Sequence, residues 1–246
     1  MTPTTRFLPV STRLALITPL AALIAACGAT SDVSTDAYSQ GLEIGAASGF
    51  AVLGASTATC TNASDVTGDV GVSPGTAITG FNPSCTITGT IHAGDGTAAQ
   101  AHSDLAIAYN NLKAVACEHN LTGTDLGGKT LAPGVYCFDT SVGLTGNLTL
   151  DGGGDATAVW IFQIGSTITT ASNSSVIMAG SGVPCNVYWQ VGSSGTIGTG
   201  TAFQGNLLAS ASITLTSGSS LVGRALALNA AVTMDHNNVS LGSCSQ

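Results

Sequence analysis

The second half of the chain, from Leu144 to Leu241, is a series of short alternating patterns separated by turns of small residues. Alternation of aliphatic residues with threonine is typical of β-strands with two different faces. The patterns are Leu148-Thr149-Leu150, Thr167-Ile168-Thr169, Thr196-Ile197-Gly198, Ile213-Thr214-Leu215 and Val232-Thr233-Met234. Strand and turn patterns at similar intervals predict a β-solenoid, with aliphatic residues in a core and threonines in a ladder outside.

The turns after these strands are also alike. They begin at Thr170, Thr199, Thr216 and Asp235, and they are rich in Gly, Ser and Asn. Similar strands in the first half begin near Phe50, Val66 and Thr86. We expect those strands to stack as rungs of the same solenoid, which makes the fold mainly β.

One segment has the periodicity of a helix. Its apolar residues are spaced by three and four, at Ala98, Ala101, Leu105, Ala108, Leu112 and Val115. This spacing predicts an α-helix over about 97–116, with Thr97 capping its start. The stripe is narrow and mostly alanine, so we expect the helix to pack closely along a flat β-face.

Charge is scarce in this chain. Charged residues make up 7% of it, and the net charge is −8. Two of the five cations, Arg6 and Arg13, lie in the N-terminal leader, which leaves Lys113, Lys129 and Arg224. So few cations exclude nucleic acid as a partner. We expect the remaining single charges to make surface or loop contacts.

The N-terminus has the features of an export signal. Residues 1–26 combine arginines, an apolar segment and small residues before Cys27. Ile24-Ala25-Ala26-Cys27 resembles the lipobox of bacterial lipoproteins, which implies lipidation of Cys27 and a membrane anchor. The alternative is ordinary cleavage that leaves Cys27 as a spare thiol. We expect an exported protein at the cell surface or in the periplasm, or a secreted one without lipidation, with a flexible tether over 27–46 and one domain over 47–246.

The other six cysteines are suited to three disulfides in an oxidising compartment. Six cysteines allow fifteen pairings. Closeness in sequence and the need to fasten the chain's ends favour one of them. The favoured pairs are Cys60–Cys85, Cys117–Cys137 and Cys185–Cys244.

Several motifs resemble the microbial ice-binding proteins built on a discontinuous β-helix with one flanking helix. The matching stretches are 68–75, 126–136, 159–164, 186–192 and 223–227, in the family's order. The resemblance implies a triangular cross-section, rungs that do not follow chain order, and adsorption to ice that inhibits its growth or recrystallisation. A Thr-(Ala/Gly)-x-(Thr/Asn) motif of some relatives is complete at Thr170-Ala171-Ser172-Asn173, whereas Thr199-Gly200-Thr201-Ala202 departs at its last position.

A threonine ladder suits an ice surface physically. Rungs repeat every ~4.7–4.9 Å, threonine is stiff at χ1, and its methyl and hydroxyl groups can hold an ordered water layer without the radial hydration of a charge. The candidate ice-binding residues are Thr149, Thr167, Thr169, Thr170, Asn173, Thr196, Thr199, Thr201, Thr214, Thr216 and Thr233. We expect a monomer that needs no cofactor, metal or small-molecule substrate.

Other interpretations use the same residues. Threonine ladders also stabilise ordinary sheets, and a tethered solenoid can serve as an adhesion or structural module for carbohydrate or protein. Many β-solenoids are polysaccharide-cleaving enzymes, but Asp151 and Asp155 favour a turn over paired catalytic carboxylates. His92, Asp95, His102 and Asp104 match no zinc spacing. We therefore predict a protein that is not an enzyme.

Overall fold

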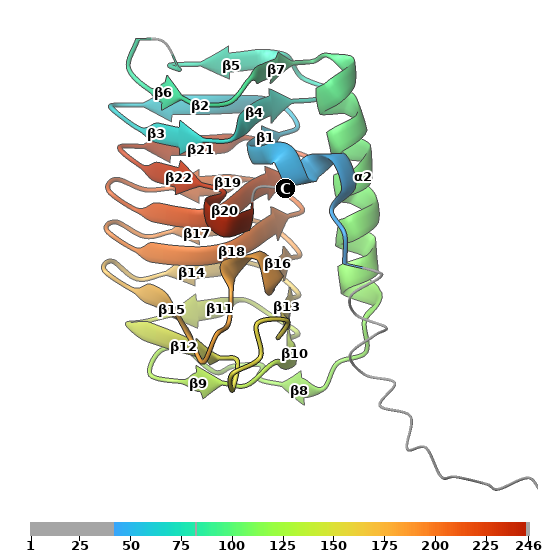
Figure 1. Ribbon diagram of the computed structural model, residues 1–246, viewed down its shortest axis with the longest axis vertical. Coiled ribbons are helices and arrows are strands. Elements are labelled where there is room, and N and C mark those ends of the chain that lie inside the picture. The colour runs from blue at the N-terminus through green and yellow to red at the C-terminus, as the bar shows by residue number, and fades with distance from the viewer. Residues whose placement is uncertain (1–41, 82, 245–246) are drawn as a thin grey trace, which may run out of the picture. The chain divides into compact units, whose positions relative to one another are not determined.

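The computed structural model describes residues 42–81 and 83–244, which form a parallel β-helix with one α-helix beside it (Figure 1). Strand pairings among the described residues are all parallel, and the strands form three faces around one core. The predicted fold class is therefore confirmed.

One face is a separate seven-stranded sheet, which we call the threonine face. Its strands, in spatial order, are β11 (Val142–Leu144), β14 (Ile168–Thr170), β17 (Gly195–Ile197), β19 (Ile213–Leu215), β21 (Val232–Asp235), β2 (Thr57–Thr61) and β5 (Ala77–Thr79).

The remaining strands form two faces that share the long strands β18 (Ala202–Ala209) and β20 (Ser220–Ala227). The helix face is made of the later parts of these two strands with β8 (His119–Asn120), β10 (Gly134–Phe138), β13 (Trp160–Ile164), β16 (Val187–Val191), β1 (Phe50–Gly54), β4 (Asp69–Val72) and β7 (Ile91–Ala93). The mixed face is made of their earlier parts with β9 (Thr130–Leu131), β12 (Asn147–Asp151), β15 (Ser175–Ala179), β22 (Asn238–Ser240), β3 (Asp65–Thr67) and β6 (Thr86–Ile87).

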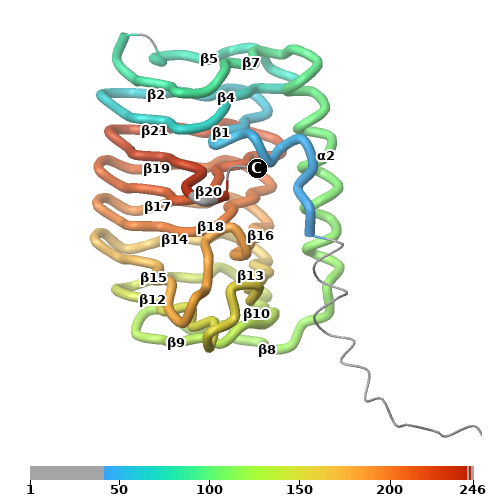
Figure 2. Tube along the Cα trace, in the orientation of Figure 1, coloured from blue at the N-terminus to red at the C-terminus, as the bar shows by residue number. Residues whose placement is uncertain are grey.

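The rungs do not follow chain order. The last long strands stack on the first ones, because β21 pairs with β2 and β20 pairs with β1. In Figure 2 the red end of the chain accordingly lies against its blue beginning. The discontinuous stacking implied by the family resemblance is present.

Aliphatic and aromatic side chains fill the interior, as alternation predicts. Tyr136, Phe162, Trp189 and Phe203 stack through successive rungs, with ring centroids 5.5, 3.9 and 4.9 Å apart. All four are buried. Each rung buries too little apolar surface to be stable alone, so this stacking joins neighbouring rungs into one core.

The helix α2 (Gly96–Ala114) runs along the helix face from the level of β7 to that of β8 (Figure 1). Its buried side includes five of the six predicted residues, Ala98, Ala101, Leu105, Ala108 and Leu112, and also Tyr109. The predicted cap, Thr97, is wrong. The N-cap is Asp95, whose carboxylate accepts a hydrogen bond from the Ala98 N–H.

The ordered domain begins earlier than the predicted boundary at 47. Leu42 and Ile44 are buried in the cluster that includes Leu105 of α2, and the 3₁₀-helix η1 (Gly45–Gly49) follows them. The end of the expected tether, from 42 to 46, is therefore part of the fold because its aliphatic side chains have a site to fill. The expected signal peptide, Cys27 and the rest of the tether lie outside the described residues.

The cysteines form the three predicted pairs, Cys60–Cys85, Cys117–Cys137 and Cys185–Cys244. The last pair joins the short 3₁₀-helices η2 (Pro184–Asn186) and η3 (Gly242–Cys244). No helix in the described part of the chain is both long and apolar enough to cross a membrane.

Candidate functional site

A single column of threonines runs across the threonine face. The register places one threonine on each of six adjacent strands, and each threonine is directly beside the next. In spatial order the column is Thr169, Thr196, Thr214, Thr233, Thr59 and Thr79. Neighbouring strands in such a sheet are ~4.7–4.9 Å apart, so the column repeats at that interval.

The column is held rigidly from behind. Ile168, Ile197 and Ile213, which neighbour column threonines on their strands, point inward and are fully buried. The β-branched threonine has restricted χ1 freedom, so little side-chain entropy is lost when its groups bind ordered water. A flat array of fixed methyl and hydroxyl groups results.

Hydroxyls beside the column extend this uncharged surface. Thr167 Oγ1 lies 2.9 Å from Ser141 Oγ, and Ser194 Oγ lies 3.1 Å from Ser212 Oγ. Within the column, Thr79 Oγ1 donates to Thr59 Oγ1 at 3.2 Å. These contacts between rungs fix hydroxyl positions on neighbouring strands. Thr167 therefore lies beside the threonine face, directly before β14.

The column ends at β11. The position beside Thr169 is Gly143, where an added Cβ would lie 2.7 Å from Asp125 Oδ2. The Asp125 carboxylate is fixed there by the Gly127 N–H at 2.7 Å and by the backbone and hydroxyl of Thr145. At this edge a carboxylate from the loop before β9 therefore lies where the next column hydroxyl would be.

Two predicted contact residues are wrong because they are buried at the corner between the threonine and mixed faces. Thr170 is 3% exposed and Thr201 is 1% exposed. Their hydroxyls are 3.1 Å apart, and Thr170 Oγ1 also accepts the Gly198 N–H at 2.8 Å. Both residues shape the corner, and their side chains are not exposed to solvent.

The other corner residues are accessible. Asn173 is exposed and has a φ of 59°, and Thr199 is exposed. Thr199 Oγ1 donates to Thr216 Oγ1 at 3.4 Å, which continues a hydroxyl contact from one rung to the next. These three residues border the column but do not belong to it.

Thr149 lies outside the threonine face. It lies on β12 in the mixed face, paired with Thr130 on one side and Ile177 on the other. Along the mixed face the aligned positions change from rung to rung, and one column contains Asn147, Ser175, Ala202, Ser220, Asn238, Asp65 and Thr86. This column therefore differs from the threonine column, in which the same residue type is repeated on every strand of the column.

Sequence reasoning missed Thr59 and Thr79, two of the six column members. Their strands precede the helix and join the column only because β21 pairs with β2. The segment Thr57-Ala58-Thr59-Cys60-Thr61 has the alternation of the later repeats, and this signal could have identified Thr59.

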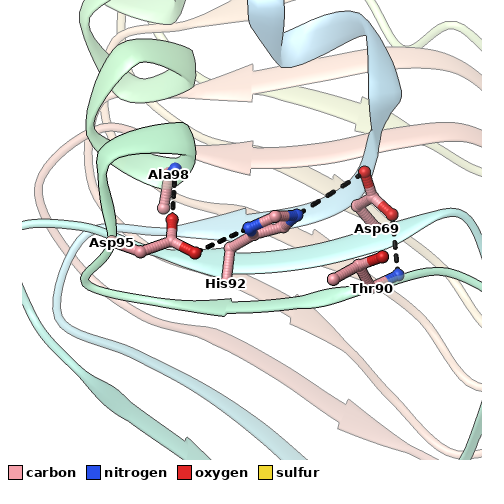
Figure 3. Close-up of polar contacts among 5 residues, drawn as sticks. All are labelled: Asp69, Thr90, His92, Asp95 and Ala98. Carbon is pink, nitrogen blue, oxygen red and sulfur yellow. Dashed lines mark hydrogen bonds and ion pairs between the residues drawn. The ribbon is translucent and has the colours of Figure 1, made fainter.

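A second polar cluster lies where the helix begins. Figure 3 shows His92 between two carboxylates, with Nδ1 2.8 Å from Asp95 Oδ2 and Nε2 3.9 Å from Asp69 Oδ2. Asp95 caps α2 through Ala98, and Asp69 accepts the Thr90 N–H at 2.7 Å. The Ala98 N–H, followed by the bond to His92, lowers the pKa of Asp95.

The cluster in Figure 3 is a structural junction between β4, β7 and α2. Asp104, the other acid considered there, accepts the Ala46 N–H and the Gln100 amide, both at 2.8 Å. Within the described ranges no group of three His, Cys, Asp or Glu side chains is arranged to hold a metal ion.

Arg224 was expected at the surface, but it is 3% exposed. It borders a cavity of ≈ 430 Å³ together with Tyr188. Its guanidinium donates to the carbonyls of Ser48 and Cys244 and to Asn206 Oδ1 at 2.6–2.9 Å. Burial lowers the pKa of Arg224 to about 10. Arg224 thus fastens the N-terminal segment and the C-terminal disulfide to the same rung.

Comparisons with known proteins agree with this geometry. A family model described as Ice-binding-like matches residues 52–240. An ice-binding protein of Nostoc sp. (strain HG1) is 53% identical over 221 residues, which are 89% of this chain and 81% of the relative. An ice-binding protein of Leucosporidium sp. (strain AY30) is 36% identical, covering 75% of this chain and 78% of the relative.

Solved structures share the fold. The crystal structure of an ice-binding protein from the Antarctic ascomycete Antarctomyces psychrotrophicus is 43% identical, with a TM-score of 0.79, and the match covers 81% of this chain and 98% of that one. An ice-binding protein from an Arctic yeast is 34% identical with a TM-score of 0.77, and the match covers 81% and 93%. The chain therefore belongs to the Ice-binding-like family.

Proposed function

We propose that this protein binds ice through the threonine face and thereby inhibits ice growth or recrystallisation. The observation that carries the proposal is the register of six threonines on six adjacent strands. The activity is supported by the family to which the chain belongs, because the similar relatives described above are named ice-binding proteins. The threonine face supplies the rigid, nearly uncharged array that such binding requires.

Adsorption needs an ordered water layer and no chemical step. Methyl groups disfavour bulk-like hydration of the face, while regularly placed hydroxyls anchor waters at fixed positions. A layer held in this way can merge with a crystal plane when the protein meets ice. We propose accordingly that the protein acts as a monomer and without catalysis.

Tyrosine substitutions test this site. Thr214 lies in the middle of the column, so Thr214→Tyr should lift the ordered layer off the surface and abolish most thermal hysteresis. The fold should survive because strands accept tyrosine at outward positions. Thr149→Tyr is the matched control, since it makes the same change on the mixed face and should leave hysteresis unchanged.

Circular dichroism and melting temperature would be measured on the same samples. Full hysteresis in a folded Thr214→Tyr protein would exclude the threonine face as the site. Loss of hysteresis in a folded Thr149→Tyr protein instead would assign binding to the mixed face.

We also propose that the protein is exported and anchored to a membrane by a lipid on Cys27. The support is the lipobox-like sequence and the even number of cysteines that remains after Cys27 is removed. Intact mass of membrane-extracted protein should show a diacylglycerol adduct, and Cys27→Ser should lack it. An unmodified soluble wild-type chain would contradict the anchor.

A further inference from the structure

One carboxylate interrupts the threonine face. Asp235 is the only charged residue within its seven strands, all of which are described. It ends β21, where Thr233 points outward, Met234 is buried and Asp235 is again half-buried on the outer side. Asp235 therefore shares the accessible side of the sheet with the column.

The neighbours of Asp235 on both adjacent strands are threonines. Thr61 of β2 is its register partner. On β19, Leu215 pairs with Met234, so Thr216 is the next residue beside Asp235. A second, shorter row of hydroxyls along the edge of the face is thus broken by one acid.

Local contacts hold the carboxylate in place without neutralising it. Asn62 Nδ2 donates to Asp235 Oδ1 at 2.5 Å, and the Asp235 N–H donates to Asn237 Oδ1 at 2.5 Å. Neither ion pair of the described residues, both formed by His92, includes Asp235. A carboxylate accepts about four hydrogen bonds, so most of its capacity is left for water.

Water around such a group opposes an ice-like layer. A carboxylate orients water hydrogens toward itself, and removing that hydration costs far more than removing it from a hydroxyl. The waters over Thr61 and Thr216 consequently cannot join across Asp235 into the layer that covers the column. The accessible side of the sheet is wider than the area that can order water.

We infer that Asp235 limits the area and strength of ice binding by the threonine face. The inference rests on the proposed function and deepens it. In its natural form the protein binds ice less strongly than its backbone geometry permits, and one neutral substitution releases the restriction.

Two substitutions at this position test the inference. Asp235→Asn removes the charge but keeps an oxygen that can accept from Asn62, so the corner is preserved. Asp235→Thr extends the row formed by Thr61 and Thr216. The control is Asp151→Asn, which makes the same charge change on the mixed face, where Asp151 Oδ1 accepts the Gly153 N–H.

The measurements are thermal hysteresis and the partition of purified protein into growing ice at equal concentration. One added or removed polar interaction changes an equilibrium by about twofold or more. We expect Asp235→Asn to raise ice partition by about twofold, Asp235→Thr by at least as much, and Asp151→Asn to leave it at the wild-type value.

Circular dichroism and melting temperature identify which variants are folded. If ice partition rises in either folded Asp235 variant and not in Asp151→Asn, the inference is supported. If it rises in neither Asp235 variant, the inference is overturned. If Thr214→Tyr also keeps full activity, the threonine face itself is wrong. If Thr214→Tyr loses activity while the Asp235 variants gain none, only the role of Asp235 fails.

Discussion

The threonine face and the mixed face are both exposed, both built from parallel strands and both rich in small polar residues. They differ in what lies side by side across the strands. On the threonine face threonine is repeated on six adjacent rungs, whereas the mixed-face column passes through five residue types. Composition alone would not separate the faces, but lateral repetition does.

The largest expected effect comes from the residues behind the two faces. Ile197 supports the threonine face and Leu148 supports the mixed face, and both are fully buried. Replacing either with alanine should lower the free energy of unfolding by about 2–5 kcal/mol. Only Ile197→Ala should also reduce thermal hysteresis in the cold, where both variants remain folded.

Urea unfolding would give the two stabilities, and hysteresis would be compared at matched folded fractions. Equal loss of hysteresis in Leu148→Ala would show that general rigidity, and not support of one particular face, controls activity.

Adjacent threonines on one strand give a finer test. Thr170 is buried and accepts the Gly198 N–H, so Thr170→Val should cost about 1–3 kcal/mol of stability. Thr169 is exposed in the column, so Thr169→Val should change stability by less than about 0.5 kcal/mol yet lower hysteresis. Thermal melts and hysteresis would be measured for both. A large stability loss in Thr169→Val would invalidate this assignment of inside and outside.

The smallest expected effect is an acid response at the helix face. The pKa of Asp95 is lowered from its ordinary value of 3.8, mainly by the Ala98 N–H. Asp95 therefore adds stability that is fully present above the unfolded pKa and is lost as pH falls through the lower folded pKa. Melting temperatures of wild type and Asp95→Asn should differ slightly at neutral pH and converge below about pH 3. A difference that grows on acidification would contradict this sign.

Alternation in the sequence was sufficient to predict which residues of a strand point outward. Thr196, Thr214 and Thr233 lie in the column because each is flanked by an inward aliphatic residue. The same rule failed at Thr170 and Thr201, where the chain bends between faces and local turn geometry decides orientation. The rule also could not assign Thr149 to a face. Alternation shows whether a side chain points inward or outward, but it does not show how far the chain turns between successive strands of one rung, and that turn decides which face a strand joins.

The pairing of distant strands was the other limit. Thr59 lies beside Thr233 although about 174 residues separate them, and no local pattern specifies that contact. The cap of α2 was wrong for a smaller reason. Asp95 and Thr97 are both suitable capping residues, and the contact between Asp95 and His92 selects the earlier one.

The length of the connection through α2 limits how many rungs this protein can have. From β7 to β8 the helix face has nine strands, whose eight intervals span about 38 Å. The 19-residue helix covers about 28 Å of this distance, and the residues on either side of it cover the rest. β7 lies at one end of the stack and β8, the next strand in the chain, lies at the other, so α2 and its flanking residues must cover the distance between them. An ordinary solenoid can gain a repeat by duplication alone. Here an added rung would also need about three more helical residues, so the width of the threonine face and the length of the helix can only change together.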